Sequence, residues 1–198
     1  MSRLEPIAPE ALPENARAVL EYARENMGFT PNDVLIMARW PELLQAMAGL
    51  VSVVFVPGRV EMPLKRMVGL ICSAAAGCQY CVAHNAFGLQ QDGMAADKQA
   101  AVWEFETSPV FSPAERAALR FARGAAMTPS QVTDAEFADL RMHFDDAQIL
   151  ELSGVIGLFG FLNRWNASLA TPLEDEPLRH ARETLSDRGW QAGKHEPA

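Results

Sequence analysis

The chain has 198 residues, of which 49% are hydrophobic, enough to fill one core but too few for two full domains. Asp and Glu number 25 against 17 Lys and Arg, giving a formal net charge of -8 with scattered basic residues. This balance argues against nucleic acid and anionic membranes as partners.

The chain also lacks the patterns that direct proteins to or through a membrane. Its most apolar run, Gly154 to Leu162, is about half of the roughly 20 residues needed to span a bilayer. The N-terminal residues MSRLEPIAPE do not form a signal peptide. We therefore expect a soluble, cytoplasmic protein.

Helix signals recur through the first half of the chain. An amphipathic pattern predicts a helix over Glu10 to Met27, and Pro41 opens a second helix that continues to about Val54. A third helix is expected from Met62 to Ala75, where Pro63 occupies the first turn. Gly77 ends that helix, and the next is expected to run from Cys78 to Asp92.

The second half carries the strongest start signals. Capping-box patterns occur at 112–115 (SPAE), 133–136 (TDAE) and, more weakly, 145–148 (DDAQ), each followed by apolar residues at helical spacing. A last helix is expected at Pro177 to Arg188. The one strand-like segment, Leu50 to Val56, is interpreted as a helix end. The pattern as a whole predicts a single all-α domain.

Three cysteines, Cys72, Cys78 and Cys81, lie within ten positions. An odd number so closely spaced is not typical of an extracellular disulfide framework. Cys72 follows Leu70 and Ile71 on an apolar helix face, so we expect it in the core. Cys78 at a helix start would have a depressed pKa, because the free N–H groups there stabilise a thiolate.

The stretch GCQYCVAHN admits three interpretations. On a helix, steps of three residues turn through about 300°, so Cys78, Cys81 and His84 follow one shallow stripe. They could form a redox dithiol in which one sulfur becomes a sulfenic acid, the other closes a disulfide and His84 moves the proton. They could instead bind zinc with His84 as a third ligand, although no second ligand pair is present. They could also be small buried side chains without chemistry.

Further polar residues stand beside apolar runs. Asn163, Arg164 and Asn166 follow a run that must be core, so they form either a helix end in solvent or the polar wall of a pocket. His143 and His180 are expected on charged helix faces and His195 in the tail, without a functional role.

The residues LKRMVGLICSAAAGCQYCVAHNAFG, from Leu64 to Gly88, resemble the carboxymuconolactone decarboxylase family in its alkyl hydroperoxidase D-like, peroxidase-related branch. The similarity continues at FTPN and ARWP near residues 29–41, at TSPVFSPAERAAL and GFLNRWNASLATPLEDEP, and in the tail GWQAGKH. The resemblance implies an all-α, alkyl hydroperoxidase D-like helical bundle with the C-x-x-C at the start of a core helix. It raises the pocket interpretation for NRWN. Tyr80, at a position where the hydroperoxidases carry a second histidine, is a further pocket candidate.

The resemblance also implies roles for individual residues. Cys81 corresponds to the peroxidatic cysteine, Cys78 to the proton donor and resolving cysteine, and His84 to the relay histidine. The family's relay acid falls at Arg66, which is instead a candidate stabiliser of a thiolate. Glu61, at the start of the same helix, is the nearest acid and the candidate relay acid.

The resulting functional hypothesis is a thiol-dependent peroxidase that reduces a small hydroperoxide. It would require an external thiol or disulfide reductant and no metal or other cofactor, and it would act as a homo-oligomer, a dimer, trimer or hexamer. The alternatives are the family's lyase activity on a small ring acid, or a non-catalytic protein with a structural or zinc-bound C-x-x-C. We expect a helical segment at 1–28, the family domain at 29–190 and a polar tail at 191–198.

Overall fold

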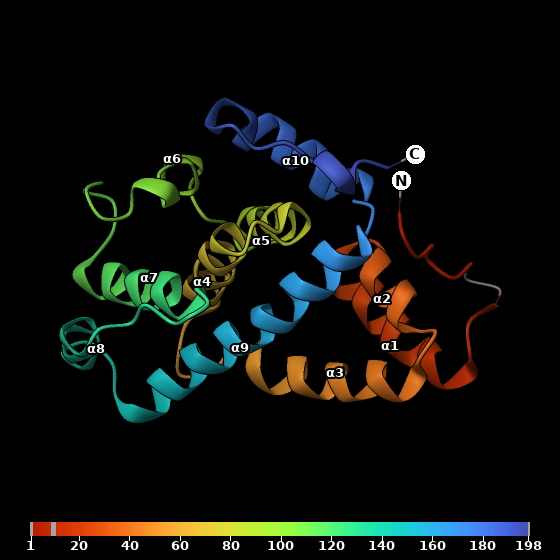
Figure 1. The fold of residues 1–198 in the computed structure, drawn as a ribbon, viewed down its shortest axis with the longest axis horizontal. Helices are drawn as coiled ribbons and strands as arrows, with labels where there is room; N and C mark the ends of the chain where they lie inside the picture. The colour runs from red at the N-terminus through yellow and green to blue at the C-terminus, as the bar shows by residue number, and fades with distance from the viewer. Residues whose placement is uncertain (1, 9–10, 198) are drawn as a thin grey trace.

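The computed structural model describes residues 2–8 and 11–197, and every regular element among them is a helix (Figure 1). The all-α prediction is therefore confirmed. The α-helices are α1 (Glu14–Met27), α2 (Asn32–Met37), α3 (Pro41–Val54), α4 (Met62–Ala75), α5 (Gln79–Gln91), α6 (Ala96–Ala100), α7 (Pro113–Ala126), α8 (Asp134–Arg141), α9 (Asp146–Leu169) and α10 (Asp175–Leu185). Short 3₁₀ turns η2 (Val102–Glu104), η3 (Ser186–Arg188) and η4 (Gly193–His195) complete the set.

Local chemistry explains why most predicted boundaries agree with the structure. In each of the three capping boxes the first side chain accepts the N–H of the fourth residue, whose own side chain accepts the N–H of the first, as between Ser112 and Glu115. The predictions for α3 and α4 match at both ends. The short helices α2 and α6 were not predicted. Glu10, where the first helix was expected to begin, lies outside the described residues, and α1 begins at Glu14.

The main core forms where α4 packs against α5, α7 and α9. The long helix α9 crosses the molecule, with α1 to α3 at one end and α7 and α8 at the other (Figure 1). Cys72 is 1% exposed in this core, as predicted, and burial raises the pKa of its thiol to about 12. A smaller apolar cluster joins α1, α2 and α3. No described helix has the length and apolar character needed to cross a membrane.

Two residues of the expected polar tail, Ala192 and His195, are buried, while the other described residues from Gln191 to Pro197 are exposed. The backbone N–H of Leu173 donates to the carbonyl of His195 at 2.9 Å, and the His195 side chain is fully buried. His180 on α10 is also buried, contrary to its predicted place on a charged face. Because η4 packs against α5, the end of the chain reaches the cysteine helix.

Candidate active site

Cys78 and Cys81 meet at the turn between α4 and α5. Gly77 has φ +70°, a left-handed conformation that favours glycine, and it reverses the chain between the two helices. Cys78 is the N-cap residue of α5, and Cys81 lies one turn into the helix. Their Sγ atoms are 3.1 Å apart, and both cysteines are free thiols. An approach of about 1 Å would bring the sulfurs to disulfide bonding distance.

The environment makes these two sulfurs unequal. The hydrogen-bond contact with Cys81 lowers the pKa of Cys78, and burial opposes this effect. The Cys81 backbone N–H and the charge of Lys194 also lower the pKa of Cys78. Burial raises the pKa of Cys81 well above its ordinary value, and the contact with Cys78 raises it further. The N-terminus of α5 also favours negative charge at Cys78. These effects favour a thiolate at Cys78 over a thiolate at Cys81.

A buried acid and base lie beside the dithiol. His84 Nε2 is 2.7 Å from Glu174 Oε2, and the Tyr80 hydroxyl donates to Glu174 Oε1 at 2.9 Å. The Tyr80 ring also stacks on the imidazole, with ring centroids 4.2 Å apart. Burial alone would lower the pKa of His84, but the Glu174 carboxylate raises it by charge and hydrogen bonding, and the net pKa is raised. Protonated His84 paired with Glu174 can therefore hold and release a proton.

A second polar group contacts Cys81 from α9. The Asn166 amide nitrogen is 3.5 Å from Cys81 Sγ and 3.2 Å from Asp33 Oδ2. The Thr171 hydroxyl donates to Asn166 Oδ1 at 2.8 Å, which fixes the orientation of the amide. Burial raises the pKa of Asp33. Cys81 thus faces an amide donor that is tied to a buried carboxyl group.

Five of the predicted site residues come together in this arrangement. They are Cys78, Cys81, His84, Tyr80 and Asn166. Together they offer a thiolate, a second thiol, a proton reservoir and a polar wall, which are the groups that dithiol redox chemistry needs.

The other predicted site residues lie elsewhere. Arg66 pairs with Asp92, with Nε 2.6 Å from the carboxylate, so its guanidinium is directed to that acid and not to the sulfurs. Glu61 is the exposed N-cap of α4, and the acid that contacts His84 is Glu174. Arg164 is exposed and donates to a carbonyl of its own helix, while Asn163 is buried with an unpartnered Oδ1.

Sequence reasoning missed the acids of the site. Glu174 belongs to the stretch TPLEDEP and Asp33 directly follows FTPN, so both lie in or beside segments that carry the family resemblance. Their place in or beside these segments was the signal in the sequence that could have identified the two acids. Glu174 is the N-cap of α10 and is 90 positions from His84, so no local spacing pattern links them.

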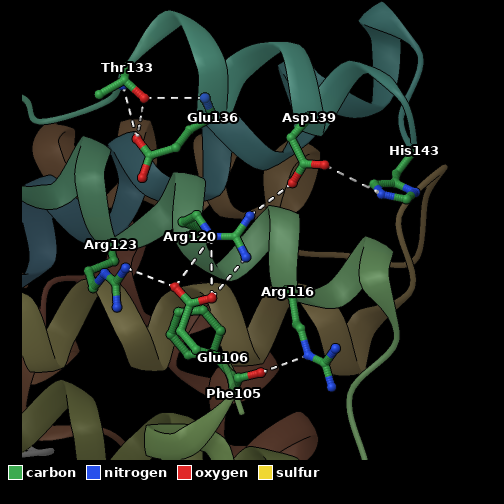
Figure 2. Close-up of polar contacts among 9 residues, drawn as sticks. All are labelled: Phe105, Glu106, Arg116, Arg120, Arg123, Thr133, Glu136, Asp139 and His143. Atoms are coloured by element: carbon green, nitrogen blue, oxygen red, sulfur yellow. Dashed lines mark hydrogen bonds and ion pairs between the residues drawn. The ribbon is translucent and has the colours of Figure 1, made fainter. Parts of the chain in front are cut away.

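A separate hollow of about 470 Å³ lies between α7 and α8, and Figure 2 shows the polar contacts among the residues around it. Figure 2 shows that Arg120 at its centre binds both Glu106 and Asp139, at 2.8 and 2.9 Å. Arg116 donates to the carbonyl of Phe105 at 3.0 Å. Arg120 is thus paired with carboxylates and Arg116 with backbone carbonyls, and no cysteine or serine lines the hollow. Across residues 2–8 and 11–197, no three His, Cys, Asp or Glu side chains are grouped as metal ligands.

Comparison with known proteins places this geometry in context. Residues 41–124 match the model of the carboxymuconolactone decarboxylase family. The Escherichia coli K12 protein YnjA is 33% identical over 120 residues, which cover 59% of this chain and 66% of YnjA. The match to the family model includes the whole of α3, α4, α5 and α6.

Solved structures extend the similarity to nearly the whole chain. The debrominase Bmp8 is 32% identical with a TM-score of 0.84, covering 93% of this chain and 96% of Bmp8. A cysteine-to-alanine variant of Bmp8 was solved in complex with 2,3,4-tribromopyrrole, and it superposes with a TM-score of 0.85. A peroxidase-related protein with an alkylhydroperoxidase AhpD core from Ralstonia eutropha JMP134 is 25% identical, with a TM-score of 0.79 over 89% of this chain and 94% of that protein.

Proposed function

The chain belongs to the carboxymuconolactone decarboxylase family, in its alkyl hydroperoxidase D-like branch, and from this premise we propose that it is a thiol-dependent oxidoreductase that reduces a small hydroperoxide. The observation that carries the proposal is the 3.1 Å contact between Cys78 Sγ and Cys81 Sγ at the start of α5. The buried His84–Glu174 pair beside it supplies the proton transfer.

The reaction takes two steps within the protein. A thiolate attacks the hydroperoxide, the O–O bond breaks, and the products are a sulfenic acid and an alkoxide that takes a proton to become an alcohol. The second sulfur then attacks the sulfenic acid, the S–O bond breaks, and a disulfide forms with release of water. The dithiol has lost two electrons to the peroxide. An external thiol or dithiol reductant returns them by disulfide exchange.

The environment of the sulfurs favours Cys78 as the attacking thiolate. The lowered pKa of Cys78 favours the thiolate at that sulfur. The raised pKa of Cys81 keeps its thiol protonated, so that this proton is available to the alkoxide that leaves the peroxide. The family resemblance implies the opposite order, with attack by Cys81. In the order we propose, Cys81 is the resolving thiol. The Asn166 amide N–H, with its nitrogen 3.5 Å from Cys81 Sγ, stabilises the negative charge that develops on this sulfur when it loses its proton.

Chemical trapping tests both the function and the order. Reduced protein is treated with one equivalent of hydrogen peroxide, and disulfides are mapped by mass spectrometry; we expect a Cys78–Cys81 disulfide, and its absence refutes the function. In Cys81→Ser, dimedone should label a sulfenic acid at Cys78, whereas Cys78→Ser should give little labelling. Strong labelling of Cys81 in Cys78→Ser, with none in the other variant, would restore the order that the resemblance implies. Cys72→Ser is the matched control and should behave as wild type.

Reductive dehalogenation is a second candidate function, because the debrominase Bmp8 matches 93% of the chain. Here a thiolate would attack the halogen of an aromatic halide, leaving a carbanion that takes a proton and a sulfenyl halide on the protein. The second thiol would displace halide and close the same disulfide. Bromide release from 2,3,4-tribromopyrrole, measured by ion chromatography in the presence of a dithiol, distinguishes this candidate from peroxide reduction.

We also propose that the protein acts as a homo-oligomer, on the basis of α3. This helix carries one acid and no basic residue, yet Leu44 is its only buried residue. Leu50 and Val53 are 43% and 75% exposed on α3, and Leu150 is 72% exposed on the adjoining α9. An apolar face of this kind is typical of a subunit interface.

A further inference from the structure

The dithiol is enclosed, so a substrate needs a route to it. Cys78 is 0% exposed and Cys81 is 3% exposed. Part of the cover is residues 189–196, which we call the C-terminal strap. Within the strap, the indole N–H of Trp190 donates to the carbonyl of Gln79 at 3.4 Å, and Lys194 lies close enough for its charge to lower the pKa of Cys78. The strap therefore lies over the first turn of α5, beside Cys78.

A groove of about 410 Å³ opens at this point. Its lining includes the aromatic residues Trp103, Phe105 and Trp190, the last of which belongs to the strap. Gln79 and Val82, the positions next to and one turn after Cys78, also line the groove, together with Ala74 at the end of α4. Trp190 and Val82 belong to the same apolar cluster as both active cysteines. The groove thus approaches the dithiol from the side of Cys78.

The chemistry of the groove indicates an uncharged ligand. Two arginines line it, but Arg123 pairs with Glu106 at 2.9 Å and Arg188 pairs with Glu104 at 2.7 Å. Glu106 is shared with Arg120, which also binds Asp139, so both groove arginines belong to charge-balanced groups of side chains. The remaining walls are mostly apolar or aromatic. The volume lies within the range of about 300–1,000 Å³ that small-molecule sites occupy. The indoles of Trp103 and Trp190 suit contact with a flat apolar body, whereas the Phe105 ring is covered by the Arg123 guanidinium, 5.2 Å from the ring centroid.

We propose that this groove binds the body of an uncharged aromatic substrate, with Trp190 as the gate between the groove and Cys78. The reducible bond then reaches Cys78 when the Trp190 indole leaves the Gln79 carbonyl. Only the redox step of this inference rests on the proposed function; binding in the groove does not. An aromatic hydroperoxide should therefore be a better substrate than hydrogen peroxide, which leaves the groove empty.

The first experiment measures binding without any reaction. Cumyl alcohol, an aromatic alcohol without a reducible bond, is titrated by calorimetry into the reduced wild type, Ala74→Trp and Ala76→Trp. Ala74 is an exposed residue that lines the groove, so a tryptophan there fills it without entering the core. Ala76, also exposed and two positions on, does not line the groove and gives the matched control. We expect at least tenfold weaker binding to Ala74→Trp alone. Absent binding to wild type, or equal binding to all three proteins, would overturn the proposal.

The second experiment measures disulfide formation in the same proteins. For cumene hydroperoxide, Ala74→Trp should raise KM about tenfold, and this loss should exceed any loss with hydrogen peroxide, while the control Ala76→Trp should keep the wild-type values for both peroxides. Trp190→Ala should speed the reaction with hydrogen peroxide, because the gate is removed, and Trp190→Phe should restore part of the slower rate. An equal loss for both peroxides in Ala74→Trp would contradict a substrate groove. If cumyl alcohol binds as expected but neither peroxide yields a disulfide, the proposed function fails and the groove remains a binding site.

Discussion

Replacing Glu174 by glutamine removes a charge from the active site while keeping the shape of the side chain. One carboxylate oxygen lies 2.7 Å from His84 Nε2, and the other accepts the Tyr80 hydroxyl at 2.9 Å. A glutamine oxygen can still accept from Tyr80, but the amide nitrogen then faces His84 without a negative charge. We expect the pKa of His84 to fall below its ordinary value, because burial lowers it and Glu174 is the main group that raises it.

The size of the effect follows from the geometry of the pair. The His84 and Glu174 side chains are 13% and 8% exposed, so water screens their interaction weakly. A hydrogen bond to a charged group contributes about 1.5–3 kcal/mol, and we expect Glu174→Gln to reduce the free energy of unfolding by about 2 kcal/mol at pH 6. Because the folded pKa of His84 is raised above 6.5, this stabilisation is complete below pH 6.5 and is lost as the pH rises through the folded pKa. The difference between wild type and variant should therefore shrink at pH 9.

Two assays measure these consequences. Urea denaturation at pH 6 and pH 9 gives the stability difference, and stopped-flow measurement of disulfide formation gives the rate. Positioned proton transfer contributes about 10²–10⁴-fold to a rate, so we expect a loss of about 10²-fold in Glu174→Gln. Asp175→Asn, an exposed neighbour on the same first turn of α10, is the control and should match wild type. A wild-type rate in Glu174→Gln, with a stability difference that does not change with pH, would refute the role of this ion pair.

Three other predictions follow from the described contacts. Iodoacetamide should alkylate Cys78 with an apparent pKa below the ordinary value of 9.0, and much faster than Cys72, whose pKa is about 12; equal rates at pH 7.5, measured by mass spectrometry, would contradict the thiolate assignment. Glu151→Gln should lower the free energy of unfolding in urea by about 2 kcal/mol, because it removes the carboxylate 3.1 Å from the ammonium of the buried Lys65. An unchanged midpoint would show that the Lys65 ammonium is satisfied by its backbone partners alone. Val53→Asp should convert the proposed oligomer to a smaller species in analytical ultracentrifugation, and an unchanged mass would place the interface elsewhere.

The amino-acid sequence determines the helices and their limits to a large degree. Capping boxes and first-turn prolines act within four residues, so their effect on the backbone is the same in a peptide and in the folded protein. For this reason α4, α7 and α9 begin where their N-terminal residues predict. The dithiol is local in the same sense, because Cys78 and Cys81 are one helical turn apart.

The acid of the site and the cover over the dithiol depend on the tertiary structure. The predicted acid, Glu61, shares a helix with Arg66, but the acid that contacts His84 arrives from the N-terminus of α10. Likewise, Ala192 and His195 in the polar-looking tail become buried because η4 packs on α5. Contacts between segments 90 or more positions apart depend on how whole helices dock, which is governed by apolar burial and not by the spacing of polar residues. Sequence patterns therefore located the pair of neighbouring cysteines, while only the docking of α10 and the C-terminal strap decided which charged and apolar groups surround them.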